Sequence, residues 1–152
     1  KLAKALWKGD ETSFEGKHFS APLITNNPRP ISNPHPRIMI GGTGPKKTLR
    51  MVAQYADACN IGAWVGKENM QKALDNLKEH CESLGRDYDT IEKTSLCTVN
   101  LSGDDTADSI IQNVKSLSEM GFTHVIFNMP DVYKETTLKT FAQEIIPAVA
   151  GL

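Results

Sequence analysis

The sequence predicts an α/β fold in which four strand–helix units share one parallel sheet. Short apolar runs alternate with longer segments whose apolar residues recur every three or four positions, as is typical of strands and amphipathic helices. Turns that contain glycine or proline separate the units, and no hairpin signal stands between one unit and the next. This alternation implies right-handed crossovers and a parallel sheet, and ligands bind at the carboxyl edge of such sheets.

Length and composition are those of an ordinary globular protein. The chain has 152 residues, of which 39% are hydrophobic and 23% are charged, and its net charge is −1. This length suits one domain with a sizeable core. The small net charge gives no support for binding nucleic acid or an acidic membrane surface, and no apolar run is long enough to span a bilayer. No signal peptide is visible, so we expect a cytoplasmic protein, and the first residue, Lys1, suggests that upstream sequence is missing.

The three cysteines, Cys59, Cys81 and Cys97, are far apart and form no Cys-x-x-Cys pair. We therefore expect buried, reduced thiols. No histidine has a spacing typical of metal ligands, so no metal site is predicted; the scattered ones are His18, His35 and His80.

The first 36 residues are expected to differ from the repeated units, although we treat residues 1–152 as a single domain. Residues 1–8 are predicted to be the end of a helix and residues 12–20 a short hairpin. An extended loop follows over residues 21–36, because its five prolines are incompatible with a helix interior or a central strand. Residues 1–36 thus form a helix tail and a proline-rich insertion before four strand–helix units in residues 37–152.

The first strand–helix unit contains the most informative stretch of the chain. Residues 38–40 are predicted to be a strand buried on both faces. The turn of residues 41–44 contains three glycines, and Pro45 suits the first position of a helix that reaches Tyr55. The residues expected to face the core are Leu49, Val52, Ala53 and Ala56.

The turn of residues 41–44 is a candidate site for an anion such as phosphate. Free N–H groups at a helix start attract anions, and Lys46 and Lys47 add positive charge. The alternative is that the glycines serve geometry alone, because positive φ angles are cheap only for glycine. The dinucleotide fingerprint is not met, since Lys47 stands where a third glycine would fall, and no Gly-Lys-Ser/Thr completes a P-loop.

The other three units follow in order. A strand over residues 56–62 precedes a helix over residues 67–84, which Gly85 ends. A strand over residues 94–101 precedes a capped helix that ends at Gly121. The residues expected to form the buried stripes of these helices are Met70, Leu74, Leu77, Cys81 and Leu84 in the first and Ile110, Val114 and Leu117 in the second.

The last unit consists of a strand over residues 123–128 and a helix over residues 134–149. The helix is expected to bury Leu138, Phe141, Ile145 and Val149.

Four side chains could take part in catalysis or ligand binding, but each also has a structural explanation. His124 lies in an apolar strand and is expected to be a hydrogen-bonded structural residue. Asp104 and Asp105 precede a helix and are expected to cap it. For Trp64 two alternatives stand: it stacks on a ligand ring, or it covers core.

Residues 36–60, PRIMIGGTGPKKTLRMVAQYADACN, resemble the central signature of the luciferase-like monooxygenase superfamily, and most of all its branch that depends on the deazaflavin coenzyme F-420. Residues 6–7, 14–19 and 121–127 also resemble this family. The resemblance implies that the four units are strands five to eight of a (β/α)₈ barrel, with coenzyme F-420 or FMN as cofactor. It also implies that the turn after strand five binds the cofactor phosphate. The residues implied are Gly41, Gly42, Thr43 and Gly44, with Asn60 and Ile61 at the end of strand six.

The implied function is therefore that of a flavin- or deazaflavin-dependent oxidoreductase, which transfers hydride to, or monooxygenates, a small organic substrate. The first four strands are absent, so we assign no catalytic residue and expect an inactive cofactor-binding half. A non-redox, phosphate-binding β/α-barrel enzyme or binding module is the alternative. A half-barrel exposes two strand edges and an inner face that we expect to be apolar, so we predict a homo-oligomer.

Overall fold

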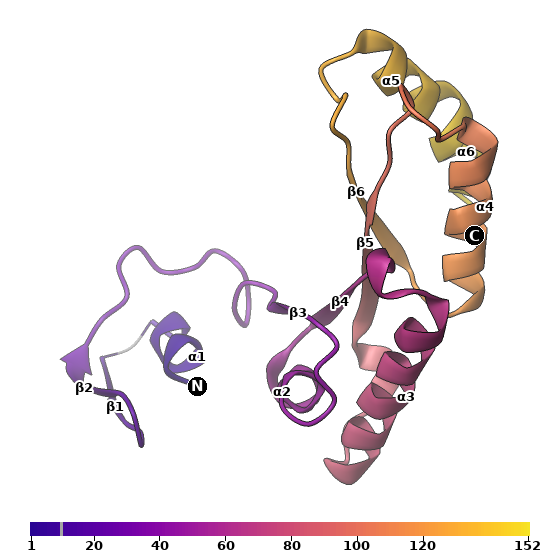
Figure 1. Ribbon diagram of the computed structural model, residues 1–152. Coiled ribbons are helices and arrows are strands. Elements are labelled where there is room, and N and C mark those ends of the chain that lie inside the picture. Colours follow the sequence, from indigo (N-terminus) through magenta and orange to yellow (C-terminus); the bar gives the residue numbers. More distant parts are fainter. Residues whose placement is uncertain (10) are drawn as a thin grey trace. The chain divides into compact units, whose positions relative to one another are not determined.

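The computed structural model describes residues 1–9 and 11–152, and these form two units, Lys1–Arg37 and Ile38–Leu152 (Figure 1). The first unit contains a short helix, α1 (Leu2–Trp7), and an antiparallel pair of strands, β1 (Thr12–Glu15) and β2 (Ser20–Ile24). The predicted hairpin is thus present, but its second strand runs four residues further than expected, through Pro22. Proline is tolerated there because a two-stranded sheet consists of edge strands.

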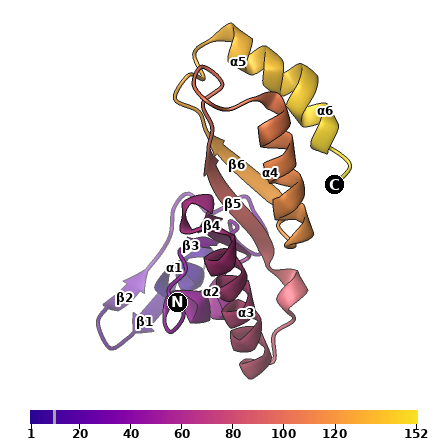
Figure 2. The ribbon, with the colours of Figure 1, turned by 45° about the vertical axis from the view of Figure 1, so that its right-hand side comes forward.

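The second unit contains a four-stranded parallel sheet, which confirms the predicted α/β fold. The strands are adjacent in sequence order: β3 (Met39–Gly41), β4 (Ala58–Gly62), β5 (Glu92–Thr98) and β6 (His124–Asn128). A helix follows each strand: α2 (Thr48–Tyr55), α3 (Lys67–Ser83), α4 (Ala107–Glu119) and a final helix of three segments, α5 (Glu135–Thr140), a π-helical turn (Phe141–Ile145) and α6 (Ile146–Val149). Figures 1 and 2 show α3 and α4 on the same side of the strands.

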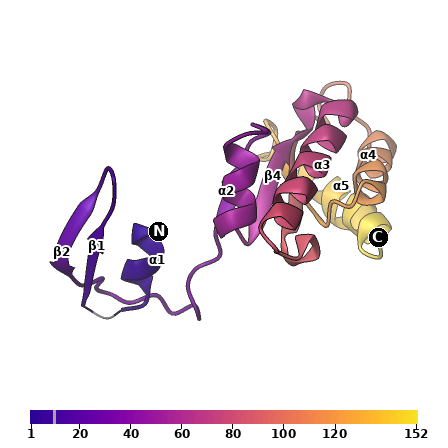
Figure 3. The same cartoon turned by 90° about the horizontal axis from the view of Figure 1, so that it is seen from below.

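The core lies between the sheet and its helices. Every residue predicted to form the buried face of α2 is at most 1% exposed, and the predicted stripe of α3 is buried from Met70 to Cys81. Seen from below, α2, α3 and α4 lie around β4 (Figure 3). A smaller cluster beneath the last helix contains Val99, Ile110, Phe141 and Ile145.

Three residues that were predicted to be buried are not: Val149 is only partly buried, and Leu84 and Leu138 are exposed. Leu84 is 36% exposed because α3 has already ended at Ser83, just before Gly85 with its φ of +64°. Leu138 is 49% exposed because the buried face of the last helix runs through Thr137, Phe141 and Ile145, four residues apart, and Leu138 lies beside that face.

The strand at the start of the sheet is not buried on both faces as expected. β3 is an edge strand, and the side chain of Met39 is 48% exposed. The face that points away from the helices is also less apolar than expected. The Asn60 amide donates a 2.7 Å hydrogen bond to the Thr94 hydroxyl, and His124 lies 3.2 Å from Glu92 on the next strand. This inner face therefore carries polar cross-strand pairs.

Candidate functional site

The sheet brings most of the predicted binding residues to one place at its carboxyl edge. Gly41 is the last residue of β3 and pairs with Asn60 of β4, so the turn of residues 41–44 lies beside the end of β4. Ile61 is the exception: its side chain is fully buried among the helices, and its carbonyl accepts a 2.9 Å hydrogen bond from the Ser95 hydroxyl. Any ligand contact of Ile61 would therefore involve its backbone.

The three positions of the turn that are occupied by glycine differ in whether the structure requires glycine there. Gly42 has a φ of +117°, a conformation that strains any other residue. At Gly44 a Cβ atom would lie 2.8 Å from the Thr48 hydroxyl, so a side chain there would require Thr48 at the start of α2 to shift. At Gly41 neither reason applies, because a Cβ would meet its nearest neighbour, the Asn60 carbonyl oxygen, at an ordinary 3.7 Å. Gly41 is thus bare and exposed although the fold permits a side chain there.

The backbone donors of the turn are only partly used. The N–H of Gly42 donates a 2.9 Å hydrogen bond to the Asn60 carbonyl, so it is not open to a ligand. Within residues 1–9 and 11–152, the N–H groups of Thr43 and Gly44 donate to no protein oxygen. Two amides of the turn therefore remain for an anion.

The helix after the turn begins at Thr48 rather than at the predicted Pro45. Residues 45–47 form an extra turn, closed by a 3.1 Å hydrogen bond from the Leu49 N–H to the Gly44 carbonyl. The first turn of α2 has neither a side-chain cap nor an acidic residue, so no side chain of that turn neutralises the positive end of the helix dipole. His80 of α3 holds the extra turn in place through a 2.6 Å contact between its Nε2 and the Pro45 carbonyl.

Trp64 lies at the same edge, immediately after β4. A Cβ built on Gly62 would lie 2.3 Å from the Cη2 and Cζ2 atoms of Trp64, so the indole occupies the space above Gly62. Gly62 is on the same face of β4 as Asn60, opposite the buried Cys59 and Ile61. The Trp64 side chain does not cover core, since the residue is 72% exposed.

A second polar group, which the sequence did not indicate, links the loops after β5 and β6. Asp131 is 4% exposed, and its Oδ2 accepts hydrogen bonds from the hydroxyls of Ser102 (2.7 Å) and Thr137 (2.8 Å). Lys134 donates a 2.8 Å hydrogen bond to the Ser102 hydroxyl. Hydrogen bonds from Ser102 and Thr137 lower the pKa of the Asp131 carboxyl. The one sequence signal that could have found this cluster is the place of Asp131, just after Pro130 and a few residues beyond the last predicted strand.

The other candidate residues have structural roles. Thr106, rather than Asp104 or Asp105, caps α4. Its hydroxyl accepts a 3.1 Å hydrogen bond from the Ser109 N–H, and its own N–H donates a 3.0 Å hydrogen bond to the Ser109 hydroxyl. Asp105 instead accepts a 2.7 Å hydrogen bond from the Asn100 N–H. His124 is hydrogen-bonded as predicted, to Glu92, although its side chain is 52% exposed.

The three thiols are free and buried, as predicted. Desolvation by burial raises the pKa of each of them, so they remain protonated and unreactive near neutral pH. In the part of the chain that the structure describes, no three His, Cys, Asp or Glu side chains are grouped so as to hold a metal ion. The helices of that same part are all too short or too polar to cross a bilayer.

A sequence profile of the luciferase-like monooxygenase family matches residues 1–140. The chain therefore belongs to this family. A search of curated protein sequences found no match.

Solved structures show the same fold at low sequence identity. One is a coenzyme F-420-dependent secondary alcohol dehydrogenase in complex with an F-420–acetone adduct, at TM-score 0.78 and 17% identity over 97% of this chain and 59% of that chain. Another is the coenzyme F-420-dependent tetrahydromethanopterin reductase from Methanopyrus kandleri, at TM-score 0.78 and 16% identity over 96% and 61%. The monooxygenase RslO1 from Streptomyces bottropensis matches at TM-score 0.68 and 17% identity over 95% and 57%. The chain thus spans about three-fifths of these relatives and is a partial (β/α)₈ barrel.

Proposed function

We propose that this chain is the cofactor-binding part of a flavin- or deazaflavin-dependent oxidoreductase, with coenzyme F-420 or FMN as cofactor. The observation that carries the proposal is the open start of α2. Its first turn has no side-chain cap and no acidic residue, and it follows a turn with two unused amides. A phosphate placed there would gain both the helix dipole and hydrogen bonds from the backbone.

The residues present fit a phosphate-bearing cofactor. Gly41 leaves space for the anion to approach the strand end, Thr43 and Gly44 would donate from their N–H groups, and Lys46 and Lys47 would supply positive charge. Asn60 lies beside Gly41 and would face the part of the ligand nearest the sheet. When bound, such a cofactor itself carries hydride between two substrates, and the protein supplies position and electrostatics.

This chain alone is expected to bind without turnover. It spans only about three-fifths of the length of its structural relatives. We propose that residues 1–152 form a single domain, the C-terminal half of a luciferase-like barrel, and that this half is inactive by itself. We also propose a cytoplasmic location, which the three free, buried thiols support.

A substitution at Gly41 tests the phosphate site. Gly41→Glu places a carboxylate at the open turn, where the structure has room for it, so we expect the stability to change by less than about 0.5 kcal/mol while FMN and F-420 binding weakens at least about tenfold. Gly41→Ala is the matched control and should retain most of the binding. Titration calorimetry with FMN, F-420, riboflavin, a sugar phosphate and inorganic phosphate measures the effect.

Three outcomes of that titration separate the alternatives. Binding of FMN or F-420 that Gly41→Glu abolishes supports the proposal. Equal binding by wild type and Gly41→Glu overturns the location of the site. Binding of a sugar phosphate without affinity for either cofactor would instead favour a non-redox, phosphate-binding β/α-barrel enzyme or binding module.

We also propose that the chain forms a homo-oligomer. β3 and β6 are the edge strands of the sheet, and exposed edges pair readily with another chain. A cavity of about 560 Å³ beside β6, between α4 and the last helix, is lined largely by apolar side chains such as Val125, Phe127 and Ile146. Light scattering that gives the mass of one chain, 16.7 kDa, at micromolar concentration would contradict this proposal.

A further inference from the structure

We propose that Trp64 is the wall of the ligand site on which the planar ring of the cofactor stacks. The proposal rests on the proposed function, which places the phosphate of the same ligand at the turn of residues 41–44. In this proposal, the mostly exposed indole of Trp64 recognises the fused heteroaromatic ring of the ligand.

The position of the indole is fixed by the end of β4. The Cη2, Cζ2 and Cε2 atoms of Trp64 lie 2.3–2.5 Å from the point where a Cβ on Gly62 would stand. One face of the ring therefore lies against the backbone of Gly62, and a side chain of any size at that position would displace it. Gly62 itself has an ordinary φ of −70°, so the glycine is required by the indole and not by the backbone conformation.

The other face of the indole is open. Trp64 is 72% exposed, whereas a tryptophan that covers core buries most of its large apolar surface. It belongs to a short 3₁₀ turn, Ala63–Val65, whose other two residues pack on the core cluster. The turn is thus anchored by its apolar neighbours, while the indole is directed away from them.

The surroundings of the indole suit the ring end of a ligand whose other end is a phosphate. Trp64 lies above the face of β4 that carries Asn60, and Asn60 is in register with Gly41 at the start of the phosphate turn. The Asn60 side chain is held by its hydrogen bond to Thr94, so it presents a fixed polar group beside the ring site. An aromatic platform next to an anion-binding turn suits a flavin or deazaflavin, since both have a flat fused ring joined to a phosphate by a flexible chain.

The test measures ring binding and phosphate binding separately on the whole chain. Riboflavin and 5-deazariboflavin carry the ring without phosphate, FMN carries both, and inorganic phosphate carries no ring. We expect Trp64→Leu to weaken the binding of riboflavin, 5-deazariboflavin and FMN about tenfold, the size of one lost aromatic stacking contact. Trp64→Phe, which keeps a ring, should lose about threefold or less. The affinity for inorganic phosphate should be unchanged in both variants.

A second substitution, at Gly62, tests the same stacking contact by displacing the indole. Gly62→Ala should displace the ring and weaken FMN binding about as much as Trp64→Leu, and the double variant should lose no more than either single one. Phe19→Leu is the control for loss of an exposed aromatic ring, because Phe19 is also 72% exposed but lies in the first unit. Thermal unfolding verifies that each variant is folded.

The outcomes distinguish this inference from the proposed function. If Trp64→Leu binds FMN and riboflavin like the wild type while Gly41→Glu abolishes FMN binding, the stacking role is wrong and the cofactor function stands. If the wild type binds inorganic phosphate but neither FMN nor F-420, the cofactor function fails and the stacking role fails with it.

Discussion

The turn between β3 and α2 and the loop between β6 and α5 occupy equivalent places at the carboxyl edge of the sheet, but they treat negative charge differently. The start of α2 has no acidic residue in its first turn. The start of α5 has Glu135, and the carboxylate of Asp131 binds the hydroxyl of Thr137 in the same turn. The start of α5 thus has carboxylates of its own, while the first turn of α2 has none.

This difference is the reason why we propose an anion site at only one of the two turns. Carboxylates at a helix start already interact with its dipole and would repel a phosphate. At the first turn, Lys46 and Lys47 replace those carboxylates, and the bare Gly41 leaves space. We therefore expect the side chains at the helix start, rather than the position of the turn in the fold, to decide whether a turn binds an anion.

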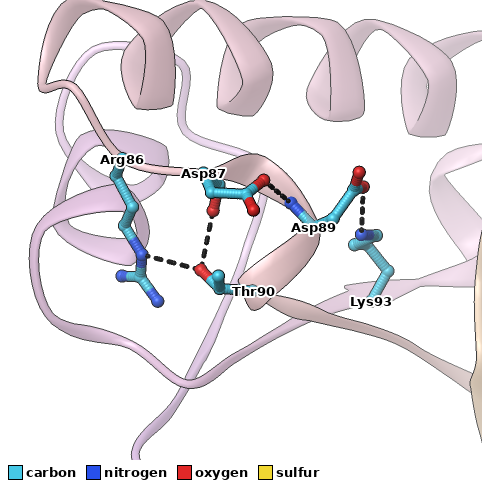
Figure 4. Close-up of polar contacts among 5 residues, drawn as sticks. All are labelled: Arg86, Asp87, Asp89, Thr90 and Lys93. Atoms are coloured by element: carbon cyan, nitrogen blue, oxygen red, sulfur yellow. Dashed lines mark hydrogen bonds and ion pairs between the residues drawn. The ribbon is translucent and has the colours of Figure 1, made fainter.

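The two helices are also held in place from different ends. Asp131 ties α5 to the loop after β5 at its start. α2 is held at its end, where the Arg86 guanidinium donates to the carbonyls of Val52, Ala53 and Ala56 at 3.4, 3.1 and 2.7 Å. Figure 4 shows the loop that positions Arg86, in which its Nε donates to the Thr90 hydroxyl at 3.3 Å. The hydrogen bonds of Arg86 therefore lie at the opposite end of α2 from the proposed ligand site.

The largest expected effect is at Arg86. Arg86→Ala removes a charged donor from three carbonyls of α2, so we expect the free energy of unfolding to fall by about 2–3 kcal/mol. Arg86→Lys should recover only part of this, because one ammonium group cannot reach all three carbonyls. Urea denaturation measures both. Full stability in Arg86→Ala would mean that core packing alone holds α2.

A smaller effect is expected at the anchor of the other helix. Asp131→Asn removes the negative charge that Ser102 and Thr137 hydrogen-bond, and we expect the Tm at pH 7 to fall by about 4 °C. Because the pKa of Asp131 is lowered in the folded protein, its contribution is present above the ordinary aspartate pKa and is lost as the pH falls through the lower folded value. The difference in Tm between wild type and Asp131→Asn should therefore shrink in acid. A difference that is constant from pH 7 to pH 2 would exclude the carboxylate as its cause.

The smallest expected effect separates the glycines of the open turn. Gly42→Ala should cost about 1–2 kcal/mol of stability, because its φ of +117° strains any side chain. Gly41→Ala should cost almost nothing, since its Cβ would meet only ordinary contacts. Denaturant unfolding of the two variants checks this order. Equal costs would show that Gly41 also serves geometry, which would weaken the case that it was left bare for a ligand.

Much of the fold was predictable because the local spacing of apolar residues specifies its helices and strands. Apolar residues at helical spacing placed α2, α3 and α4 and their buried faces, and the four short apolar runs placed the strands. The glycine turn and five of the six proposed contact residues come together as expected, since parallel strands end at one edge of the sheet.

Other features depend on partners distant in the sequence. The sequence indicated a helix start at Pro45, but the Gly44 carbonyl and His80 produce an extra turn before Thr48. The sequence also suggested an apolar inner face, because a single strand does not reveal that its polar residue pairs with one on the next strand, as Asn60 does with Thr94.

The repeated strand–helix order, the buried stripes and the glycine turn could be read from local pattern, because each depends on residues within about ten positions of one another. Three features became visible only in the folded chain: which amides of the turn are already used, the place of the Trp64 indole over Gly62, and the link that Asp131 makes between two loops. Hydrogen-bond saturation and packing are set by atoms that approach from other segments of the chain, and no local pattern specifies where those segments lie.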